Sequence, residues 1–416
     1  MRIDADTSPI SDDRRARQLL ALTLVPNLGP VLIARLLDQF GSPDAVLGAS
    51  AARLSGIRGI GRTRSSQIAR DLGGVQPKVD EELDKIRRVK AHVVTLFDEQ
   101  YPPLLRELAG APPVLFVRGN LLSAGRDRYA MAIVGSRKCT LYGSEQASRF
   151  GNALSSAGLC IVSGGARGID TAAHKGALSA GGSTTVVLGC GLGHVYPPEN
   201  ELLFDEIVER GGAIVSELPV DTAPTPKNFP ARNRIISGMS LGVLVIEAAR
   251  GSGALITAKH ATEEHGREVM GVPGRVDAPS SAGTNDLLKD GAHLVTEPSD
   301  VIGILERCAR HLYCGTHHAM AADPAQPSIF DQADLDRAPA SSGPSTSPTA
   351  APGGDPLIGV DDPIERSILG LLVEPRTGDE LSEALALSPG EVRAKLTMLE
   401  ISGRVKRAGS RFVLAR

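Results

Sequence analysis

The sequence predicts an α/β protein whose centre is a doubly wound parallel sheet. Between about 129 and 310, short and continuously apolar runs alternate with segments of helical periodicity. Continuous apolar runs are typical of parallel strands that are covered on both faces. Two of the runs, at 131–134 and 160–162, each end in a Gly/Ser loop that opens into a helix. Such units point backbone amides and a helix N-terminus at an anion, so we expect an extended Rossmann-like domain with a phosphate site.

The first part of the chain, 12–88, is predicted to be all-helical. Two segments, 25–29 and 57–61, combine apolar residues with a glycine turn and precede a helix. They resemble helix-hairpin-helix (SAM-like) turns, in which glycine amides at a helix N-terminus hold a DNA phosphate. Two tight turns that only pack a small helical bundle are the alternative. Three arginines around the second turn favour DNA contact: Arg58, Arg62 and Arg64.

The sheet domain is predicted to occupy 91–312. Strand-like runs at 92–98 and 114–119 are joined by a proline-rich segment and lead into the central sheet. The intervals between the later runs have room for helices of about 10–15 residues, which fits strand–helix alternation. The later strand candidates are 131–135, 159–164, 184–191, 212–217, 242–248, 267–274 and 292–297.

After about 310 the composition changes sharply. The segment 319–359 is rich in Ala, Pro, Ser, Gly and Asp and has little to bury, which predicts a disordered linker. The remainder, 360–416, contains three amphipathic helices and a short β-wing, the pattern of a C-terminal winged helix. Its third helix, 389–401, would be the element that reads a DNA groove. The exposed charges of that helix are mixed in sign while the wing is basic, so DNA docking and protein docking both remain open.

Composition sets further limits. The 416 residues carry a formal net charge of −3, so any nucleic-acid binding must come from locally clustered cations. Five cysteines and no apolar leader fit a reduced, cytoplasmic protein, and no apolar run is long enough to span a membrane. Aromatic residues make up only 3% of the chain, so base stacking is not expected to dominate a nucleic-acid contact.

Three glycine-containing loops, at 135–137, 163–168 and 189–193, are expected at the carboxyl ends of strands, where open α/β sheets bind ligands. None matches G-x-G-x-x-G, and G-x-x-x-x-G-K-[ST] is absent from the sequence, which argues against a dinucleotide or Walker-type ATP site. Purely structural turns are the alternative. The domain is slightly acidic overall, yet lysines and arginines gather beside these loops, which favours a bound polyanion.

Two of these cations, Arg232 and Arg234, lie two residues apart in a predicted helix and therefore diverge. At most one is expected to face the ligand. The other would hold a loop or pair with an acid such as Glu217 or Glu247.

Serine, aspartate and histidine occur together in 163–174, but the nucleophile elbow G-x-S-x-G is missing, so we assign no catalytic residue. Asp170 and His174 are expected to orient the glycine loop instead. A group near the linker has a spacing that matches none of the common zinc patterns, so no metal and no cofactor is expected; its members are Cys308, Cys314, His317 and His318.

Taken together, the motifs resemble the DNA-processing protein A family (DprA, also called Smf), and the resemblance covers nearly the whole chain. The matching stretches are GSR at 135–137, SGGARGIDTAAH at 163–174, GLGHVYPPEN at 191–200, SELP at 216–219, FPARNRIISGMS at 229–240, VIEAARGSGALITAKHA at 245–261 and VPGRVDAPSSAGTNDLLKDGA at 272–292. The long linker and the segment 308–318 depart from simpler members.

The resemblance implies a non-catalytic single-stranded DNA-binding protein that protects incoming DNA and loads the RecA recombinase onto it during natural transformation. It also implies displacement of single-strand-binding protein and a homodimer formed through the Rossmann domain. Carried onto this sequence, the DNA-binding residues would be Gly135, Ser136, Arg137, Lys138, Ser163, Gly164, Gly165, Arg167, Gly168, Lys175, Arg232, Asn233 and Arg234.

Two other functions compete. One is a nucleotide-hydrolysing enzyme similar to the phosphoribohydrolases of the "lonely guy" family, but their PGGxGTxxE signature is absent and the nearest loop is 249–258. The other is a nucleotide-sensing adaptor with the winged helix as its output. Tight binding of a mononucleotide would favour the adaptor, whereas binding with a steep salt dependence and little base preference would favour the DNA-binding protein.

Overall fold

The computed structural model describes residues 14–121, 129–306 and parts of 363–414, and within the last region the residues 363–372, 376–385, 392, 396, 399, 405–408 and 411–414. The chain divides into two compact units, Met1–Pro339 and Ala340–Arg416. The predicted linker 319–359 and the group Cys308, Cys314, His317 and His318 lie outside the described residues.

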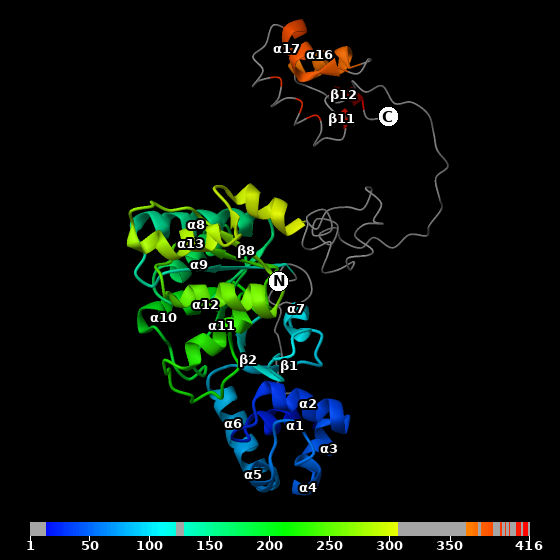
Figure 1. The fold of residues 1–416 in the computed structure, drawn as a ribbon, viewed down its shortest axis with the longest axis vertical. Coiled ribbons are helices and arrows are strands. Elements are labelled where there is room, and N and C mark those ends of the chain that lie inside the picture. The colour runs from blue at the N-terminus through cyan, green and yellow to red at the C-terminus, as the bar shows by residue number, and fades with distance from the viewer. Residues whose placement is uncertain are drawn as a thin grey trace, which may run out of the picture. The chain divides into compact units, whose positions relative to one another are not determined.

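The helical part of the first unit precedes the first strand (Figure 1). Glycines cap two of its helices at the N-terminus: Gly29 precedes α2, and Gly61 precedes α5. These are the two turns that the sequence predicted. The helices are α1 (Arg14–Thr23), α2 (Pro30–Phe40), α3 (Pro43–Leu47), α4 (Ala51–Leu54), α5 (Arg62–Gly73) and α6 (Gln76–Arg88).

A nine-stranded sheet forms the centre of the unit, in the order β1-β2-β6-β5-β4-β3-β7-β8-β9. All pairings from β6 to β9 are parallel, as the continuous apolar runs predicted. The hairpin of β1 and β2 adds to β6 in antiparallel register and makes the sheet mixed. The strands are β1 (His92–Thr95), β2 (Val114–Gly119), β3 (Ala130–Val134), β4 (Cys160–Ser163), β5 (Thr184–Val187), β6 (Ala213–Ser216), β7 (Gly242–Val245), β8 (Glu268–Gly271) and β9 (His293–Leu294).

Helices cover both faces of this sheet. On one face Met131 and Ile161 join the core with α8 and α9, and on the other Ala132 and Val162 join the core with α11 and α12. The helices of this domain are α7 (Pro103–Arg106), α8 (Leu141–Ser156), α9 (Ile169–Ser179), α10 (Glu201–Glu209), α11 (Asn228–Gly238), α12 (Gly253–Lys259) and α13 (Ala282–Lys289), with short η2 (Pro198–Asn200), η3 (His260–Glu264) and η4 (Pro279–Ser281). No helix among the residues described is long and apolar enough to cross a membrane.

The helical part shares its core with the sheet. Leu19 and Ile86 from the helices belong to the same buried cluster as Phe116 of β2 and Phe204 of α10. A polar link adds to this contact, since the buried carboxylate of Glu82 accepts a hydrogen bond of 2.6 Å from the Val220 amide. The two regions of the first unit are therefore packed as one body.

The second unit contains α16 (Pro363–Leu371), α17 (Gly378–Leu385) and a sheet in the order β10-β12-β11. Its strands are β10 (Arg376–Thr377), β11 (Val405–Ala408) and β12 (Arg411–Leu414), and β11 pairs with β12 as an antiparallel wing. Of the predicted third helix, residues 392, 396 and 399 are described; all are helical and their apolar side chains are buried.

Candidate nucleic-acid interface

The three glycine loops leave the carboxyl ends of neighbouring strands, β3, β4 and β5. The first two loops touch: the Ile169 amide donates to the Ser136 carbonyl at 3.2 Å. Gly168 permits this contact, because its φ of +76° favours glycine and a Cβ there would lie 2.4 Å from the Ser136 oxygen. The strand ends thus bring 135–137 and 163–168 together, as the sequence predicted.

A buried carboxylate organises the first loop. Glu247, two residues past β7, receives hydrogen bonds from the Thr140 amide (3.2 and 3.3 Å) and from the Thr140 hydroxyl (2.6 Å). Its carbonyl also accepts from the Ser136 amide at 2.7 Å. Of the two acids proposed as partners for the arginines of α11, Glu247 therefore binds the start of α8 instead.

Asp170 organises the second loop from the first turn of α9. Its carboxylate accepts from the Ala166 amide at 3.2 Å, which is the loop-orienting role that the sequence predicted. Burial raises the pKa of this carboxyl group, while Arg232 acts in the opposite direction. From outside the helix, Asn200 donates to the Gly165 carbonyl at 2.9 Å.

His174 lies elsewhere. Its Nδ1 is 2.7 Å from the hydroxyl of Thr184 in β5, so its hydrogen bond is made to the sheet and not to the glycine loop. Burial lowers its pKa to about 3, and Arg232 adds to this effect, so the ring is neutral at physiological pH. The predicted orienting role belongs to Asp170 alone, because the ring of His174 faces the strand side of α9.

The two arginines of α11 diverge, as expected from their spacing. Arg232 is 4% exposed, and its guanidinium donates to the carbonyls of Gly164 (2.8 Å) and Val187. Arg234 forms an ion pair with Glu217 and donates to the Gly110 carbonyl. Asn233, between them, donates to the Gly253 carbonyl at 3.0 Å. All three side chains hold the protein together, and neither arginine presents an unengaged guanidinium to a ligand.

Other cations of the predicted set are exposed: Arg137, Lys138, Arg167 and Lys175. The Arg137 guanidinium lies over the ring of Phe229, 5.0 Å from its centroid. Arg167 forms an ion pair of 2.6 Å with Glu199, which is also exposed, and this contact raises the pKa of the arginine. Arg137, Lys138 and Arg167 form the rim of the loop cluster. Lys175 does not belong to it, because it lies further along α9, beside His174, whose ring contacts the first residue of β5 at the amino end of the strand.

Sequence reasoning missed two aromatic residues on this rim. Phe229 begins α11 in contact with the glycine loop at 189–193, since a Cβ on Gly189 would lie 2.7 Å from its ring. The ring of Tyr196 is 5.3 Å from that of Phe229, centroid to centroid, and is tilted by 43°. Both rings are half-buried. The sequence did contain a signal for both residues, because each aromatic lies in a segment that also carries loop residues and prolines. These segments are VYPPEN and NFPARN.

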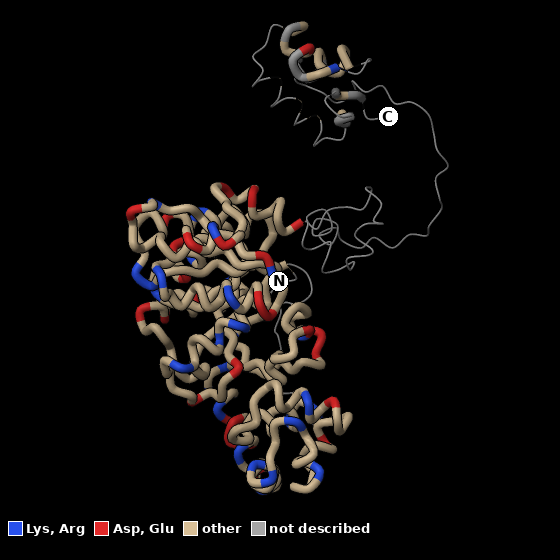
Figure 2. The backbone as a smooth tube through the Cα atoms, viewed as in Figure 1, with Lys and Arg blue, Asp and Glu red and all other residues tan. Residues whose placement is uncertain are grey.

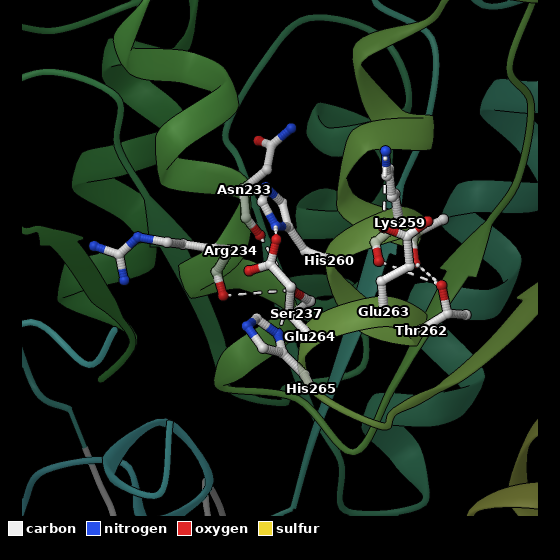
Figure 3. Close-up of polar contacts among 10 residues, drawn as sticks. Asn233, Arg234, Ser237, Lys259, His260, Thr262, Glu263, Glu264 and His265 are labelled. Atoms are coloured by element: carbon white, nitrogen blue, oxygen red, sulfur yellow. Dashed lines mark hydrogen bonds and ion pairs between the residues drawn. The ribbon is translucent and has the colours of Figure 1, made fainter. Parts of the chain in front are cut away.

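A polar cluster anchors the other end of α11 (Figure 3). Ser237 Oγ lies 3.0 Å from His265 Nδ1, and His260 Nδ1 lies 2.9 Å from Glu264 across the π-helical turn η3. Burial lowers the pKa of His265 to about 4, so this contact is made by a neutral ring. Arg234 points away from the cluster in the same view. The carboxyl end of α11 is thus anchored to the segment that follows α12.

In the helical part, arginines tie the two hairpin turns to each other. Arg64 donates to the carbonyls of Asn27 and Gly59, and Arg35 donates to the Arg58 carbonyl at 3.0 Å. The guanidinium of Arg64 is therefore occupied, although Arg64 is exposed at the second turn, as are Arg58 and Arg62. Figure 2 shows Lys and Arg as well as Asp and Glu distributed over the described part of the first unit, in keeping with the small net charge of the chain.

Three family models match the chain. Residues 92–306 match DNA recombination-mediator protein A, residues 344–410 match the DprA winged helix domain, and residues 19–73 match a SAM-like helix-hairpin-helix tandem. The last two matches confirm the predicted winged helix and the predicted hairpin turns.

Individual relatives agree. The chain is 35% identical to protein Smf of Synechocystis over 93% of this chain and 95% of that protein. It is 36% identical to DNA processing protein DprA of Bacillus subtilis over 57% of this chain and 79% of that one. The crystal structure of DprA from Streptococcus pneumoniae superimposes with a TM-score of 0.59 at 34% identity, covering 69% of this chain and 97% of that one. The chain belongs to the DNA recombination-mediator protein A (DprA/Smf) family.

Proposed function

We propose that this protein binds single-stranded DNA at the rim of the glycine loops, protects the strand and loads a RecA recombinase onto it during DNA uptake, without catalysing a reaction. Its relatives are named DNA processing proteins and DNA recombination mediators. Within this proposal, Arg137, Lys138 and Arg167 contact phosphates, while Arg232 holds the loop at 163–168 in position.

The observation that carries the proposal is the contact of Arg137 with Phe229, with Tyr196 beside it. Single strands are bound without sequence preference by cations that follow the backbone and aromatic rings that stack on bases. Here an exposed cation and two half-buried rings lie together at the ligand-binding edge of an open α/β sheet. Stacking therefore contributes more at this rim than the low aromatic content predicted.

The carboxylates beside the loops support a role in binding rather than catalysis. Asp170 is 7% exposed and Glu247 is 2% exposed, and both accept hydrogen bonds from main-chain amides. Neither is exposed to a ligand, and a third carboxylate beside the loops, that of the exposed Glu199, is paired with Arg167. This argues against the phosphoribohydrolase alternative, in which a glutamate would act on a bound nucleotide.

The first test uses two arginines of equal exposure at opposite edges of the sheet. Arg167 pairs with Glu199 beside the loops, and Arg210 pairs with Glu206 just before β6, at the amino end of the strands; each side chain is 51% exposed. Anisotropy of labelled oligo-dT across a salt series measures the affinity. We expect Arg137→Ala and Arg167→Ala to weaken binding and to reduce the salt slope by about 0.7 for each lost phosphate contact. Arg210→Ala should bind as the unchanged protein does.

If all three variants bind equally, the strand lies elsewhere, on the helical part or on the winged helix. If the unchanged protein does not bind oligo-dT, the proposal fails and the nucleotide-sensing adaptor becomes the leading function. Binding of a labelled mononucleotide in the same assay would support that adaptor.

Recombinase loading, displacement of single-strand-binding protein and a homodimer complete the proposal, with the protein acting in the cytoplasm. Loading predicts that this protein shortens the lag of RecA filament assembly on DNA coated with single-strand-binding protein. A protein that binds oligo-dT but leaves the lag unchanged would be a strand-binding protein without a loading role. Sedimentation velocity on the full chain tests the dimer.

A further inference from the structure

The strand order of the sheet reverses between β3 and β7. Connections run outward from β3 through β4 and β5 to β6, and the chain then returns to the other side of β3 as β7. In open α/β sheets such a reversal opens a crevice at the carboxyl ends of the strands, and phosphate groups bind there at a helix N-terminus. In this chain the helix that begins at that point is α8 (Leu141–Ser156).

The carboxylate of Glu247 already stands at this position. Glu247 follows the end of β7 and is 2% exposed. Its carboxylate accepts hydrogen bonds from both the amide and the hydroxyl of Thr140, the N-cap of α8. The Thr140 hydroxyl in turn accepts from the Gly143 amide at 3.1 Å. The Thr140 amide and hydroxyl and the Gly143 amide, which are donors that an external phosphate could use, are therefore engaged within the protein.

Gly143 leaves the room that this carboxylate needs. A Cβ at Gly143 would lie 2.1 Å from the Glu247 Oε2 atom, which is much closer than any real contact of that kind. The first turn of α8 is thus shaped around the carboxylate of a residue that is distant in sequence. This cradle is an independent sign that the position is built for one particular anion.

We propose that the carboxylate of Glu247 permanently occupies the phosphate position in the crevice of this fold. Free nucleotides are therefore excluded from the crevice, and only a DNA strand that lies across the rim is bound. A negative charge already occupies the phosphate position, and a second anion would meet both repulsion and overlap. The cations that remain, Arg137 and Lys138, lie outside on the loop that Glu247 holds. The selection of DNA over free nucleotides rests on the proposed DNA binding. The occupation of the crevice by Glu247 is independent of it.

The test is chemical rescue of the full chain without any DNA. Glu247→Ala removes the carboxylate and leaves its cradle empty. We expect sodium acetate to raise the melting temperature of this variant by about 2–4 °C over sodium chloride at equal ionic strength, the shift expected when one charge returns to a helix N-terminus. The matched control is Thr140→Val, which loses a ligand of the carboxylate but keeps the carboxylate itself. Neither this control nor the unchanged protein should respond to acetate more than to chloride.

A second measurement tests whether Glu247 prevents nucleotides from binding. In an Arg137→Ala background, which weakens the rim, titration calorimetry with thymidine monophosphate should detect binding only when Glu247→Ala is also present. The proposal is overturned if acetate stabilises the unchanged protein equally, if Glu247→Ala gains nothing from acetate, or if thymidine monophosphate binds the Arg137→Ala protein just as well.

If Glu247→Ala does not fold, Glu247→Gln decides the question. The glutamine amide oxygen can still accept from Thr140, but the charge is gone. We expect this variant to fold and to melt about 2–4 °C below the unchanged protein. A melting temperature equal to that of the unchanged protein would overturn the proposal, because the position would then not require an anion.

Discussion

Four arginines lie near the same edge of the sheet, and they fall into two pairs that differ in almost every respect. Arg137 and Arg167 are exposed on loops, one over an aromatic ring and the other in a solvent-facing ion pair. Arg232 and Arg234 lie on α11 and donate to carbonyls and to the partly buried carboxylate of Glu217. Proximity to a binding edge therefore does not decide what an arginine does there.

The difference comes from the carbonyl groups at the strand ends. Where β4 and β5 stop, the carbonyls of Gly164 and Val187 are buried and need donors that no neighbouring strand supplies. Arg232 reaches both from a helix that crosses behind the loops. Arg137 and Arg167 belong to the loops themselves and are not required as donors to these carbonyls.

The largest effect expected from this comparison is on stability. Arg232→Ala leaves two buried carbonyls without this donor and removes the larger of the two positive charges that act on the Asp170 carboxyl, so we expect the free energy of unfolding to fall by about 3–5 kcal/mol. Arg137→Ala should change it by about 0.5 kcal/mol or less, as is usual for an exposed position. Urea denaturation of both variants makes the comparison. Similar losses for the two variants would contradict the division into a buried and an exposed pair.

The next effect separates charge from stacking at the rim. Phe229→Ala should weaken oligo-dT binding by about tenfold, within the range for one stacked base, and leave the salt slope unchanged. Arg137→Ala, by contrast, should lower the slope. Phe229→Tyr keeps the ring and serves as the control. A change in slope for Phe229→Ala would mean that the ring acts only by placing the arginine.

A third effect concerns pH. Burial holds the pKa of His174 at about 3, whereas an unfolded histidine takes up its proton at about 6.5. The unfolded state therefore binds more protons between these values, and the contribution of His174 to stability falls as the pH is lowered through this window. His174→Gln should lose stability less steeply than the unchanged protein between about pH 6.5 and 4. Parallel curves from urea denaturation at each pH would show that His174 does not carry this dependence.

Much of this arrangement was predictable from local patterns. The continuous apolar runs gave the parallel strands, and the loops that follow them, at 135–137 and 163–168, fell at one edge because parallel strands end together. The spacing of Arg232 and Arg234 also gave their divergence, and Glu217, the partner of Arg234, was one of the two acids proposed for that role. Each of these inferences needs only a helix or strand period and the rule for strand ends.

The remainder depended on contacts between distant segments. Glu247 binds the start of α8 across 107 positions of sequence, and no local pattern marks it as the ligand of Thr140. Likewise Phe229 meets Arg137 only because α11 crosses behind the loops, so the aromatic part of the rim could not be read from composition. His174 faces β5 because of the rotation of α9 about its axis, which the sequence pattern left undetermined.

The core shared by the helical part and the sheet has a practical consequence for dissecting this protein. A cut between 88 and 91, where the strand pattern begins, would strip Leu19 and Ile86 from Phe116 and expose a continuous apolar surface. It would also remove the Glu82 carboxylate from the Val220 amide, in the segment that leads to Phe229. A sheet domain expressed alone would therefore be prone to aggregate, and its loss of DNA binding would say nothing about hairpin turns. Point substitutions at Arg58 and Arg62, in the uncut chain, are the sound way to ask whether the helical part touches DNA.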